Sequence, residues 1–306
     1  MYSFTILEQD TAVNYEKLTY PYYQRLLQEL TPEKLVIAIG VEFESEPIGL
    51  ILATYWNSSN HSKIYAKILS LFVVPSYRCQ GLGKALLGRM EIELQSRGCC
   101  EVSLSYVESP NSPTLEKILN QSNWTVPNAT ALICYASRVK LEQASQPHLI
   151  EYLEKLEKKL PPSYTIFFWR DLTAQEREAI ESQIQTDTLV RQSNPFTEES
   201  KIEPLNSLGL RYQNKVIGWM ITHRTAPDTI RYTQLFVEPD FQPLSRSILM
   251  LVKSILIHVE KATEATKATW QTDINNAQMV NFIYRRLAPY LDEIRKSFVS
   301  TKSFKA

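Results

Sequence analysis

Apolar and polar residues follow two different periodicities along the first 140 positions. Runs of alternating or β-branched apolar residues predict strands at residues 2–8, 34–44, 48–56, 63–74, 101–106 and 129–136. Apolar residues at helical spacing predict one or two helices over 13–30 and single helices at 82–97 and 114–121. Gly98 is placed to end the helix at 82–97. Antiparallel strands come first and helix-linked strands follow, which predicts a mixed α/β domain.

The same order of segments occurs twice. The strand-like segment "PIGLILATYW" from Pro47 is matched by "VIGWMITHR" from Val216, and "LFVVPSY" from Leu71 is matched by "LFVEPDF" from Leu235. Ile48 lies 23 positions before Leu71 (71 − 48), and Ile217 lies 18 before Leu235 (235 − 217). Each copy opens with a strand-like piece, "YSFTILEQD" and "SYTIFFWRD". The chain is therefore predicted to contain two copies of one domain.

A polar, charged segment, "EQASQPHLIEYLEKLEKKLPPS", separates the copies. It carries four leucines at helical spacing before a Pro-Pro stop, namely Leu149, Leu153, Leu156 and Leu160. A linker helix that docks one apolar stripe and a helix that belongs to one domain's own core both fit this pattern. The expected division is an N-terminal domain at 1–140, a linker helix at 141–162 and a C-terminal domain at 163–306.

Composition narrows the class of protein. Lys plus Arg and Asp plus Glu each number 33 in 306 residues, so no net charge favours nucleic acid or an anionic membrane as a partner. No signal-peptide pattern or membrane-length apolar run is seen, and we expect a soluble cytoplasmic protein. The four cysteines show no CxxC spacing and the histidines are scattered, so no metal site is expected. The sequence leaves the oligomeric state undetermined.

Two closely spaced glycines stand out in "RCQGLG", Arg78 to Gly83, between a strand and an apolar helix. A Walker A loop requires Ser or Thr after its lysine, but Ala85 follows Lys84. A Rossmann turn requires a third glycine, but position 86 is leucine. The remaining pattern is RxxGxG. Its glycines let the backbone wrap a pyrophosphate, and the helix start offers unpaired N–H groups to that charge.

This loop resembles the signature loop of the GNAT acyltransferase superfamily, and the order of elements resembles that family once in each half. The resemblance implies an α/β fold of two GNAT-like domains in tandem, each a mostly antiparallel mixed sheet flanked by helices. It also implies acetyl-CoA, or another acyl-CoA, as co-substrate. Backbone groups of the Leu71 strand would pair with the pantetheine arm, the loop would hold the phosphates, and a residue after the fifth strand would touch the cofactor. The residues that match these roles are Leu71, Phe72 and Val73 for the arm, Arg78, Cys79, Gln80, Gly81, Leu82, Gly83 and Lys84 for the phosphates, and Asn111 at the mouth.

The second copy departs from the family pattern. It has "QPLSRS" at 242–247, so both glycines are serines and a proline removes one N–H. We therefore expect the C-terminal half to be degenerate and not to bind CoA in the usual way. Tyr284 matches the family's tyrosine that protonates the departing thiolate, but packing on its own sheet fits it better. In the first copy that position falls on Ile118 or Leu119, which cannot donate a proton.

The general base and the acceptor site are less defined. The family's glutamate position aligns with Lys67 in the first copy and Arg231 in the second. The pocket candidates, each of which also fits solvated surface, are Tyr106, Glu108, Glu42, Glu44 and His61. Four tyrosines of the early helices fit either an acceptor site or aromatic packing, namely Tyr15, Tyr20, Tyr22 and Tyr23. No catalytic residue is assigned.

The predicted function is transfer of an acetyl or other acyl group from acyl-CoA to an amine of a small molecule or peptide, with the active site in the N-terminal half. The alternative is a non-catalytic acyl-CoA sensor or scaffold. The missing acid in the first copy and the missing base in both motivate this alternative.

Overall fold

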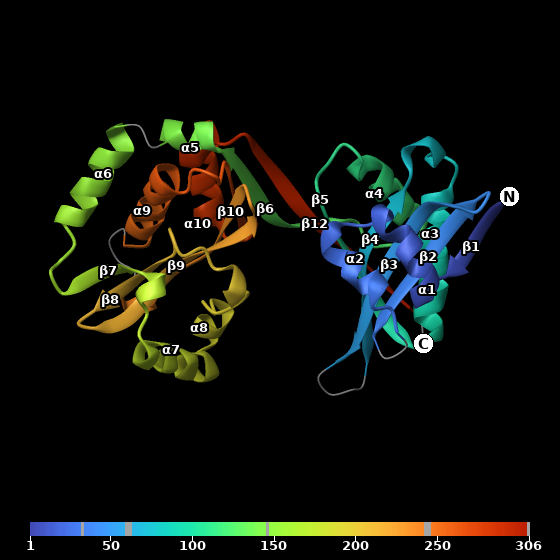
Figure 1. Cartoon of the computed structure of the whole chain (residues 1–306), viewed down its shortest axis with the longest axis horizontal. Helices are drawn as coiled ribbons and strands as arrows, with labels where there is room; N and C mark the ends of the chain where they lie inside the picture. Colours follow the sequence, from blue (N-terminus) through green and yellow to red (C-terminus); the bar gives the residue numbers. More distant parts are fainter. Residues whose placement is uncertain (32–33, 59–62, 145–146, 242–245, 305–306) are drawn as a thin grey trace. The chain divides into compact units, whose positions relative to one another are not determined.

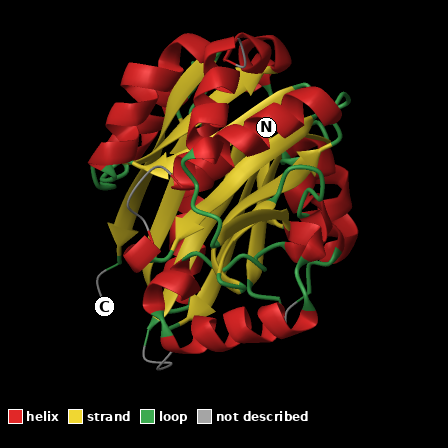
Figure 2. Cartoon of the chain, turned by 90° about the vertical axis from the view of Figure 1, so that its left-hand side faces the viewer, coloured by secondary structure: helices red, strands yellow, loops and turns green. Residues whose placement is uncertain are grey.

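The computed structural model describes residues 1–306 except 32–33, 59–62, 145–146, 242–245 and 305–306 (Figure 1). Helices lie on both faces of mixed sheets (Figure 2), which confirms the α/β fold class. The chain forms two compact units. Unit 1 consists of residues 1–130 and 296–306, and unit 2 consists of residues 131–295.

Unit 1 contains a mixed sheet with the strand order β1-β2-β3-β4-β5-β12. All neighbours in it pair antiparallel except β4 and β5, which run parallel. Its strands are β1 (Tyr2–Ile6), β2 (Val36–Phe43), β3 (Glu46–Asn57), β4 (Ile64–Val73), β5 (Cys99–Val107) and β12 (Glu293–Ser303). Its helices are α1 (Gln9–Ala12), η1 (Val13–Leu18), α2 (Pro21–Gln28), η2 (Pro75–Tyr77), α3 (Leu82–Ser96) and α4 (Ser112–Gln121). The helices and strands predicted for the first copy are therefore confirmed, with ends shifted by a few residues.

Both faces of the unit 1 sheet are covered by apolar side chains of helices. On one face, Leu86, Met90 and Leu94 of α3 are fully buried against strand residues such as Ile68. On the other face, Tyr15, Leu18 and Leu27 pack over β2 to β4. The helical spacing of these apolar residues is what turns one side of each helix toward the sheet.

Unit 2 repeats this architecture with the strand order β6-β11-β10-β9-β8-β7, in which β10 and β11 run parallel. Its strands are β6 (Asn128–Ser137), β7 (Tyr164–Phe168), β8 (Leu208–Tyr212), β9 (Lys215–Ala226), β10 (Thr229–Val237) and β11 (Lys267–Asp273). Its longer helices are α5 (Arg138–Ala144), α6 (Pro147–Lys158), α7 (Ala174–Thr186) and α9 (Arg246–Lys261). Its shorter helical segments are η3 (Trp169–Asp171), α8 (Thr188–Gln192), η4 (Glu199–Lys201), η5 (Pro239–Phe241), α10 (Ala277–Phe282), η6 (Ile283–Leu287) and η7 (Ala288–Tyr290).

The final strands of the two copies are exchanged. β6 ends the first sequence copy, yet it pairs with β11 over Ala131 to Ser137. β12 ends the second copy, yet it pairs with β5 over Ser297 to Ser303 (Figure 1). The compact units therefore divide the chain differently from the sequence repeat. Unit 1 is complete only when the C-terminal strand has joined it.

The segment between the copies forms α5 and α6. Leu153, Leu156 and Leu160 are half-buried whereas the residues between them are exposed, as a single apolar stripe requires. Lys253 Nζ of α9 donates to Glu157 Oε1 of α6 at 2.6 Å. The segment thus packs within unit 2, and the side chain of Leu149 lies outside the described residues.

The repeated Ile-Gly pair has a steric reason in both units. A Cβ on Gly49 would lie 3.2 Å from the Phe72 carbonyl oxygen of β4 and 2.7 Å from Val41 Cγ1. A Cβ on Gly218 would lie 2.7 Å from the Phe236 carbonyl oxygen of β10. Phe72 and Phe236 are the central residues of the two LFV segments. Each glycine therefore lets its own strand, β3 or β9, approach that segment closely.

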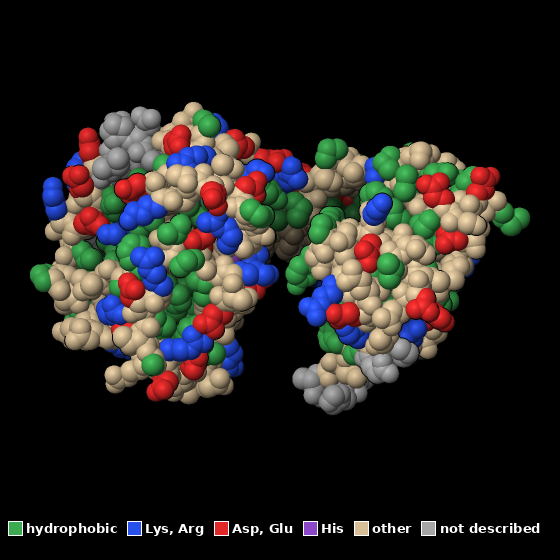
Figure 3. All heavy atoms as spheres, in the orientation of Figure 1, with side chains coloured by type: hydrophobic (Ala, Val, Ile, Leu, Met, Phe, Trp, Pro, Cys, Tyr) green, Lys and Arg blue, Asp and Glu red, His purple; other side chains and the backbone are tan. Residues whose placement is uncertain are grey.

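The surface agrees with the charge balance of the sequence. On the face drawn in Figure 3, basic and acidic side chains are interspersed over each unit. Among the described helices, none has both the length and the apolar character needed to cross a membrane.

Candidate functional site

The β4 and β5 strands of unit 1 separate toward their carboxyl ends. Their register pairs run from Ile64 and Cys99 to Ile68 and Leu104 and end there. On the other edge of β4, Ser70 pairs with Leu52 and Ile68 with Ala53, so Leu69 is an extra residue that forms a β-bulge. A bulge bends its strand and increases the local twist, which turns the rest of β4 away from β5. The result is an opening in the sheet flanked by 69–73 on one side and 105–107 on the other.

A tight loop follows β4 at this opening. After η2, Cys79 has φ +61° and Gly81 has φ +80°, and Gly81 is the N-cap of α3. A side chain at Gly81 would be strained by the backbone conformation, although no described heavy atom lies within 4 Å of its Cβ position. The glycine thus permits a left-handed turn and leaves free space on the outer side of the loop.

The first turn of α3 presents backbone donors to that space. The Ala85 N–H is the donor that closes the first helical turn, onto the Gly81 carbonyl at 3.0 Å. The N–H groups of Leu82, Gly83 and Lys84 precede it and have no intrahelical acceptor. A Cβ on Gly83 would meet Ile118 Cδ1 at 3.3 Å, so Gly83 also permits close packing of α3 on α4. These donors and the positive end of the helix dipole suit a phosphate group.

Loop side chains reinforce this arrangement. Arg78 Nε donates to the Val73 carbonyl at 2.9 Å, and its guanidinium lies 5.6 Å from the centre of the Phe72 ring. The Tyr2 hydroxyl donates to Gln80 Oε1, which attaches the loop to β1. Lys84 Nζ lies 3.5 Å from Gln121 Oε1 of α4. Arg78, Cys79, Gln80 and Lys84 are all exposed.

The predicted cofactor residues therefore gather at one end of the sheet. Leu71 to Val73 border the opening, Arg78 to Lys84 form the loop and helix start, and Asn111 is the N-cap of α4 after β5. Since β4 and β5 are parallel, their carboxyl ends share this edge. Asn111 is exposed, and its side chain accepts no capping hydrogen bond. Contact of these residues with a cofactor remains a prediction.

A hydrogen-bonded pair lies beside the opening, and the sequence indicated only one of its two members, Tyr106. The Tyr106 hydroxyl of β5 donates to Glu116 Oε1 of α4 at 2.6 Å. Partial burial and the Glu116 carboxylate raise the pKa of Tyr106 above its ordinary value, so the phenol stays protonated at neutral pH. Glu116 was not predicted, because its role depends on α4 facing β5. Ile118 is half-buried and Leu119 fully buried in the core under α4, and neither offers a proton.

The other pocket candidates are scattered. Glu42 accepts a 2.8 Å hydrogen bond from buried Tyr15, and burial followed by that carboxylate raises the pKa of Tyr15. Glu44 lies in the turn between β2 and β3 with φ +50°. Glu108 Oε2 accepts from the Lys296 N–H at 3.2 Å. His61 lies outside the described residues.

Unit 2 has the same opening with different surroundings. Thr233 is the extra residue of a bulge in β10, and the pairs between β10 and β11 end at Tyr232 and Trp270. The loop expected to be degenerate includes 242–245, which lie outside the described residues. Phe236 of β10 packs on Trp219 with a ring separation of 4.6 Å, and Trp219 lies 6.1 Å from Trp169. These rings pack with Ile180 of α7 and Val190 of α8 in one core cluster.

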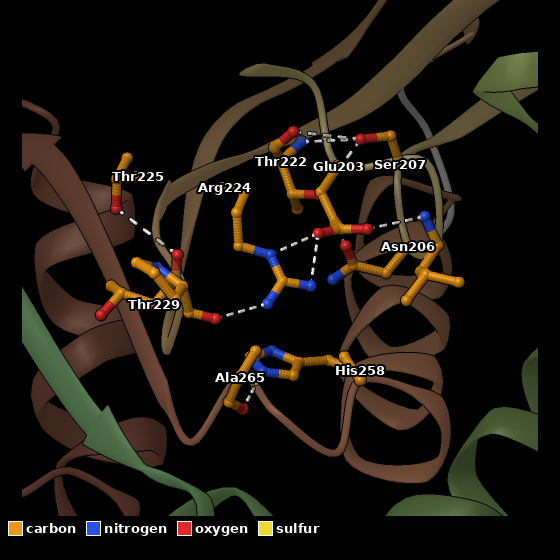
Figure 4. Close-up of polar contacts among 12 residues, drawn as sticks. Glu203, Asn206, Ser207, Thr222, Arg224, Thr225, Thr229, His258 and Ala265 are labelled. Atoms are coloured by element: carbon orange, nitrogen blue, oxygen red, sulfur yellow. Dashed lines mark hydrogen bonds and ion pairs between the residues drawn. The ribbon is translucent and has the colours of Figure 1, made fainter.

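A buried polar network stabilises unit 2 (Figure 4). Arg224 Nε donates to Glu203 Oε2 at 2.6 Å, and Thr222 Oγ1 donates to Asn206 Oδ1 at 2.6 Å. His258 Nε2 donates to the Ala265 carbonyl at 2.9 Å, and its Nδ1 lies 3.0 Å from the Tyr232 hydroxyl. Each of these buried groups has a hydrogen-bond partner, so a structural role explains the network.

Known proteins with a similar sequence or fold support the interpretation of the loop and of the two repeated units. The sequence profile of the Acetyltransferase (GNAT) family matches residues 3–116. A tandem GNAT protein from the clavulanic acid biosynthesis pathway superposes with a TM-score of 0.68 at 12% identity, covering 99% of this chain and 98% of that one. A GCN5-related N-acetyltransferase from Sphaerobacter thermophilus superposes with a TM-score of 0.61 at 13% identity, covering 100% and 96%. Among curated proteins, no significant match was found.

Residues 3–116 therefore match the GNAT acetyltransferase family, and over its whole length the chain has the fold of a tandem GNAT protein. The resemblance expected from the RxxGxG loop and the repeat is confirmed. The GNAT domain and fold support N-acyltransferase activity in general.

Proposed function

We propose that unit 1 binds acetyl-CoA, or another acyl-CoA, and transfers the acyl group to an amine, while unit 2 is a degenerate copy. One observation carries this proposal: the β4–β5 opening and the glycine loop at the start of α3 lie at the same end of the sheet. The opening suits an extended arm that pairs with strand backbone, and the helix start suits a pyrophosphate. The separation between them is bridged by a single short loop, residues 74–81.

The proposed reaction is an aminolysis of a thioester. The neutral amine nitrogen attacks the carbonyl carbon, a C–N bond forms and the C–S bond breaks. The nitrogen loses one proton, the departing thiolate gains one, and the products are the amide and the free thiol. A backbone N–H of β4 near Phe72 or Val73, in the segment that pairs with β3 but no longer with β5, would stabilise the developing oxyanion, an effect worth about 3 kcal/mol for one donor in a dry site. Positioning of amine and thioester in the opening supplies a further part of the rate.

Two αL glycines at opposite ends of α3 give a matched test of the phosphate cradle. Gly81→Glu puts a carboxylate where the pyrophosphate is proposed to lie, and Gly98→Glu changes a glycine of similar φ, +77°, at the far end of the helix. Calorimetry should show acetyl-CoA affinity lowered by roughly tenfold or more, about 1.4 kcal/mol, in Gly81→Glu and by less than about twofold in Gly98→Glu. Equal affinities in both variants would show that the loop is not the phosphate site.

Turnover separates the enzyme from the alternative of a sensor. Buried Leu119 and half-buried Ile118 at the family's acid position favour the sensor, so the assay is needed. Thiol release from acetyl-CoA with a panel of amines supports the transferase. Tight binding of acetyl-CoA without transfer to any amine supports the sensor. We expect one acetyl-CoA per chain, and a stoichiometry of two would contradict the degenerate state of unit 2.

A further inference from the structure

A cluster of three tyrosine rings lies at the start of α2 in unit 1, on the side of the β4–β5 opening that η1 and α2 cover. The rings belong to Tyr20, Tyr22 and Tyr23. Tyr23 meets the Tyr20 ring at 6.2 Å and the Tyr22 ring at 5.3 Å, both edge to face. Tyr23 is half-buried against the core, whereas Tyr20 is 65% and Tyr22 is 77% exposed. Tyr15, by contrast, is 1% exposed and bonded to Glu42, which makes it a packing residue and not part of this cluster.

A side-chain hydrogen bond places the cluster beside the opening. The hydroxyls of Thr19 and Ser70 lie 2.8 Å apart. Ser70 directly follows the bulge at Leu69, where pairing of β4 with β5 has already ended. Phe72, two residues further along β4, turns to the same face and packs against the same core as Tyr23. Aromatic side chains therefore line this side of the opening from α2 to β4.

The electrostatic character of this surface selects among amines. The segment that carries the rings, "TYPYYQ" at 19–24, contains no charged residue. The one charged residue within α2 is Arg25, which bonds to Glu29 Oε1 at 2.5 Å. Burial and the neighbouring tyrosines raise the pKa of Tyr23, so this phenol stays protonated at physiological pH. The carboxylate next to this segment is that of Glu16 in η1, which accepts from Gln28 Nε2 at 3.0 Å. A second ammonium on a polyamine would therefore find no carboxylate within 19–24 and would have to compete with Gln28 for Glu16.

We infer that the tyrosine cluster selects an acceptor amine whose body is an uncharged aromatic ring, which adds edge to face to the exposed rings of Tyr20 and Tyr22. This inference rests on the proposed function for the position of the reacting amine. Aromatic pairs of this geometry contribute beyond their buried area, and Tyr rings lose little conformational freedom on binding. The amine lies at the end of a short chain from the ring and reaches the opening beside Ser70.

Initial rates with four amines test the inference: 2-phenylethylamine, benzylamine, butylamine and 1,4-diaminobutane. We expect kcat/KM for the two aromatic amines to exceed that for butylamine by roughly tenfold. Tyr20→Ala/Tyr22→Ala should reduce this ratio to near one, because it lowers kcat/KM for the aromatic amines more than kcat/KM for butylamine. Tyr20→Phe/Tyr22→Phe should keep the ratio, and Tyr290→Ala, an exposed tyrosine of unit 2, should leave it unchanged.

A binding measurement keeps the inference separate from the proposed reaction. Calorimetric titration of 2-phenylethylamine into the chain saturated with CoA does not require turnover. Binding that depends on Tyr20 and Tyr22 without any transfer would support the cluster and overturn the transferase. Transfer with a ratio unchanged in the double alanine variant, a preference for 1,4-diaminobutane, or no binding of the aromatic amines would overturn the cluster's role.

Discussion

At the scale of single residues, the role of some glycines follows from the sequence, whereas the role of others is seen only in the structure. The left-handed turn at Gly81 could be inferred from RxxGxG, because a short local pattern determines it. In the sequence, Gly49 and Gly218 are recognisable only as the glycine of the repeated Ile-Gly pair. Their reason is a neighbouring strand that follows 23 residues later at Phe72 (72 − 49) and 18 residues later at Phe236 (236 − 218). Sequence spacing does not report that approach.

Gly218→Ala is expected to destabilise unit 2. The added Cβ would lie 2.7 Å from the Phe236 carbonyl oxygen, and a backbone atom in a central strand cannot move aside freely. Overpacking of this kind costs about 1–3 kcal/mol. Gly88→Ala is the control, since no described heavy atom lies near its Cβ position in α3, and it should stabilise by about 0.5–1 kcal/mol. Urea denaturation followed by tryptophan fluorescence would measure both, and equal effects would contradict the steric reason.

His258 should make unit 2 sensitive to mild acid. Burial lowers the pKa of this imidazole, and its neutral form donates to Ala265 while the Tyr232 hydroxyl faces its other nitrogen. The unfolded chain therefore takes up the proton first. The stabilisation is fully present above the unfolded pKa of about 6.5 and declines as pH falls from there toward the lower folded pKa.

The measurement is the free energy of unfolding between pH 7.5 and 5. The slope attributable to His258 is at most about 1.4 kcal/mol per pH unit. His258→Gln should reduce the slope, although it also lowers stability at pH 7.5. A pH profile that is as steep in the variant as in the natural chain would assign the acid sensitivity to other groups, of which His223 is the nearest in kind, since burial lowers its pKa as well.

At the scale of elements, periodicity identified the helices and strands of the first copy but not their partners, and β12 was not predicted. A strand pattern states that a segment is extended and which side is apolar. It does not indicate that β12 pairs with β5, because the paired residues are 190 (297 − 107) to 202 (303 − 101) positions apart. The exchange of β6 and β12 is decided by tertiary contacts such as the stacking of Phe298 on Tyr106 at 5.4 Å. The Tyr106–Glu116 pair was likewise not predicted, because it depends on the tertiary packing of α4 against β5.

Lys302 attaches β12 to the rest of unit 1. Its ammonium donates to Glu91 Oε2 of α3 and to the Ser122 carbonyl, and Glu91 Oε1 also accepts from the Trp124 indole. The two charges are 21% and 13% exposed, so solvent screens them only in part. Lys302→Met should lower stability by about 1–3 kcal/mol, because it leaves a mostly buried carboxylate with one donor. A double-mutant cycle with Glu91→Gln by thermal denaturation checks the pair, and additive effects would show that the ion pair contributes nothing.

At the scale of the whole molecule, the sequence predicted the family resemblance, the repeat and the end of the sheet where the proposed cofactor loop lies. These depend on local motifs and their order. The acceptor face was left open because its rings matter only through their position beside Ser70, and that position depends on how η1 and α2 pack over β4. The division into units also needed the structure, since it follows from the exchanged strands.

The exchange predicts that the two halves differ in their ability to fold alone. A fragment of residues 1–140 contains the cofactor loop but lacks β12, so the β5 edge at 101–107 and the partners of Phe298 and Lys302 would be exposed. We expect this fragment to aggregate and to bind acetyl-CoA at least tenfold more weakly than the whole chain. A peptide of residues 293–303 added in trans should restore part of the affinity. Residues 131–295 contain the part of β6 that pairs with β11 and the other strands of unit 2, so this fragment should unfold cooperatively on its own. Full acetyl-CoA affinity in 1–140 would show that β12 is dispensable.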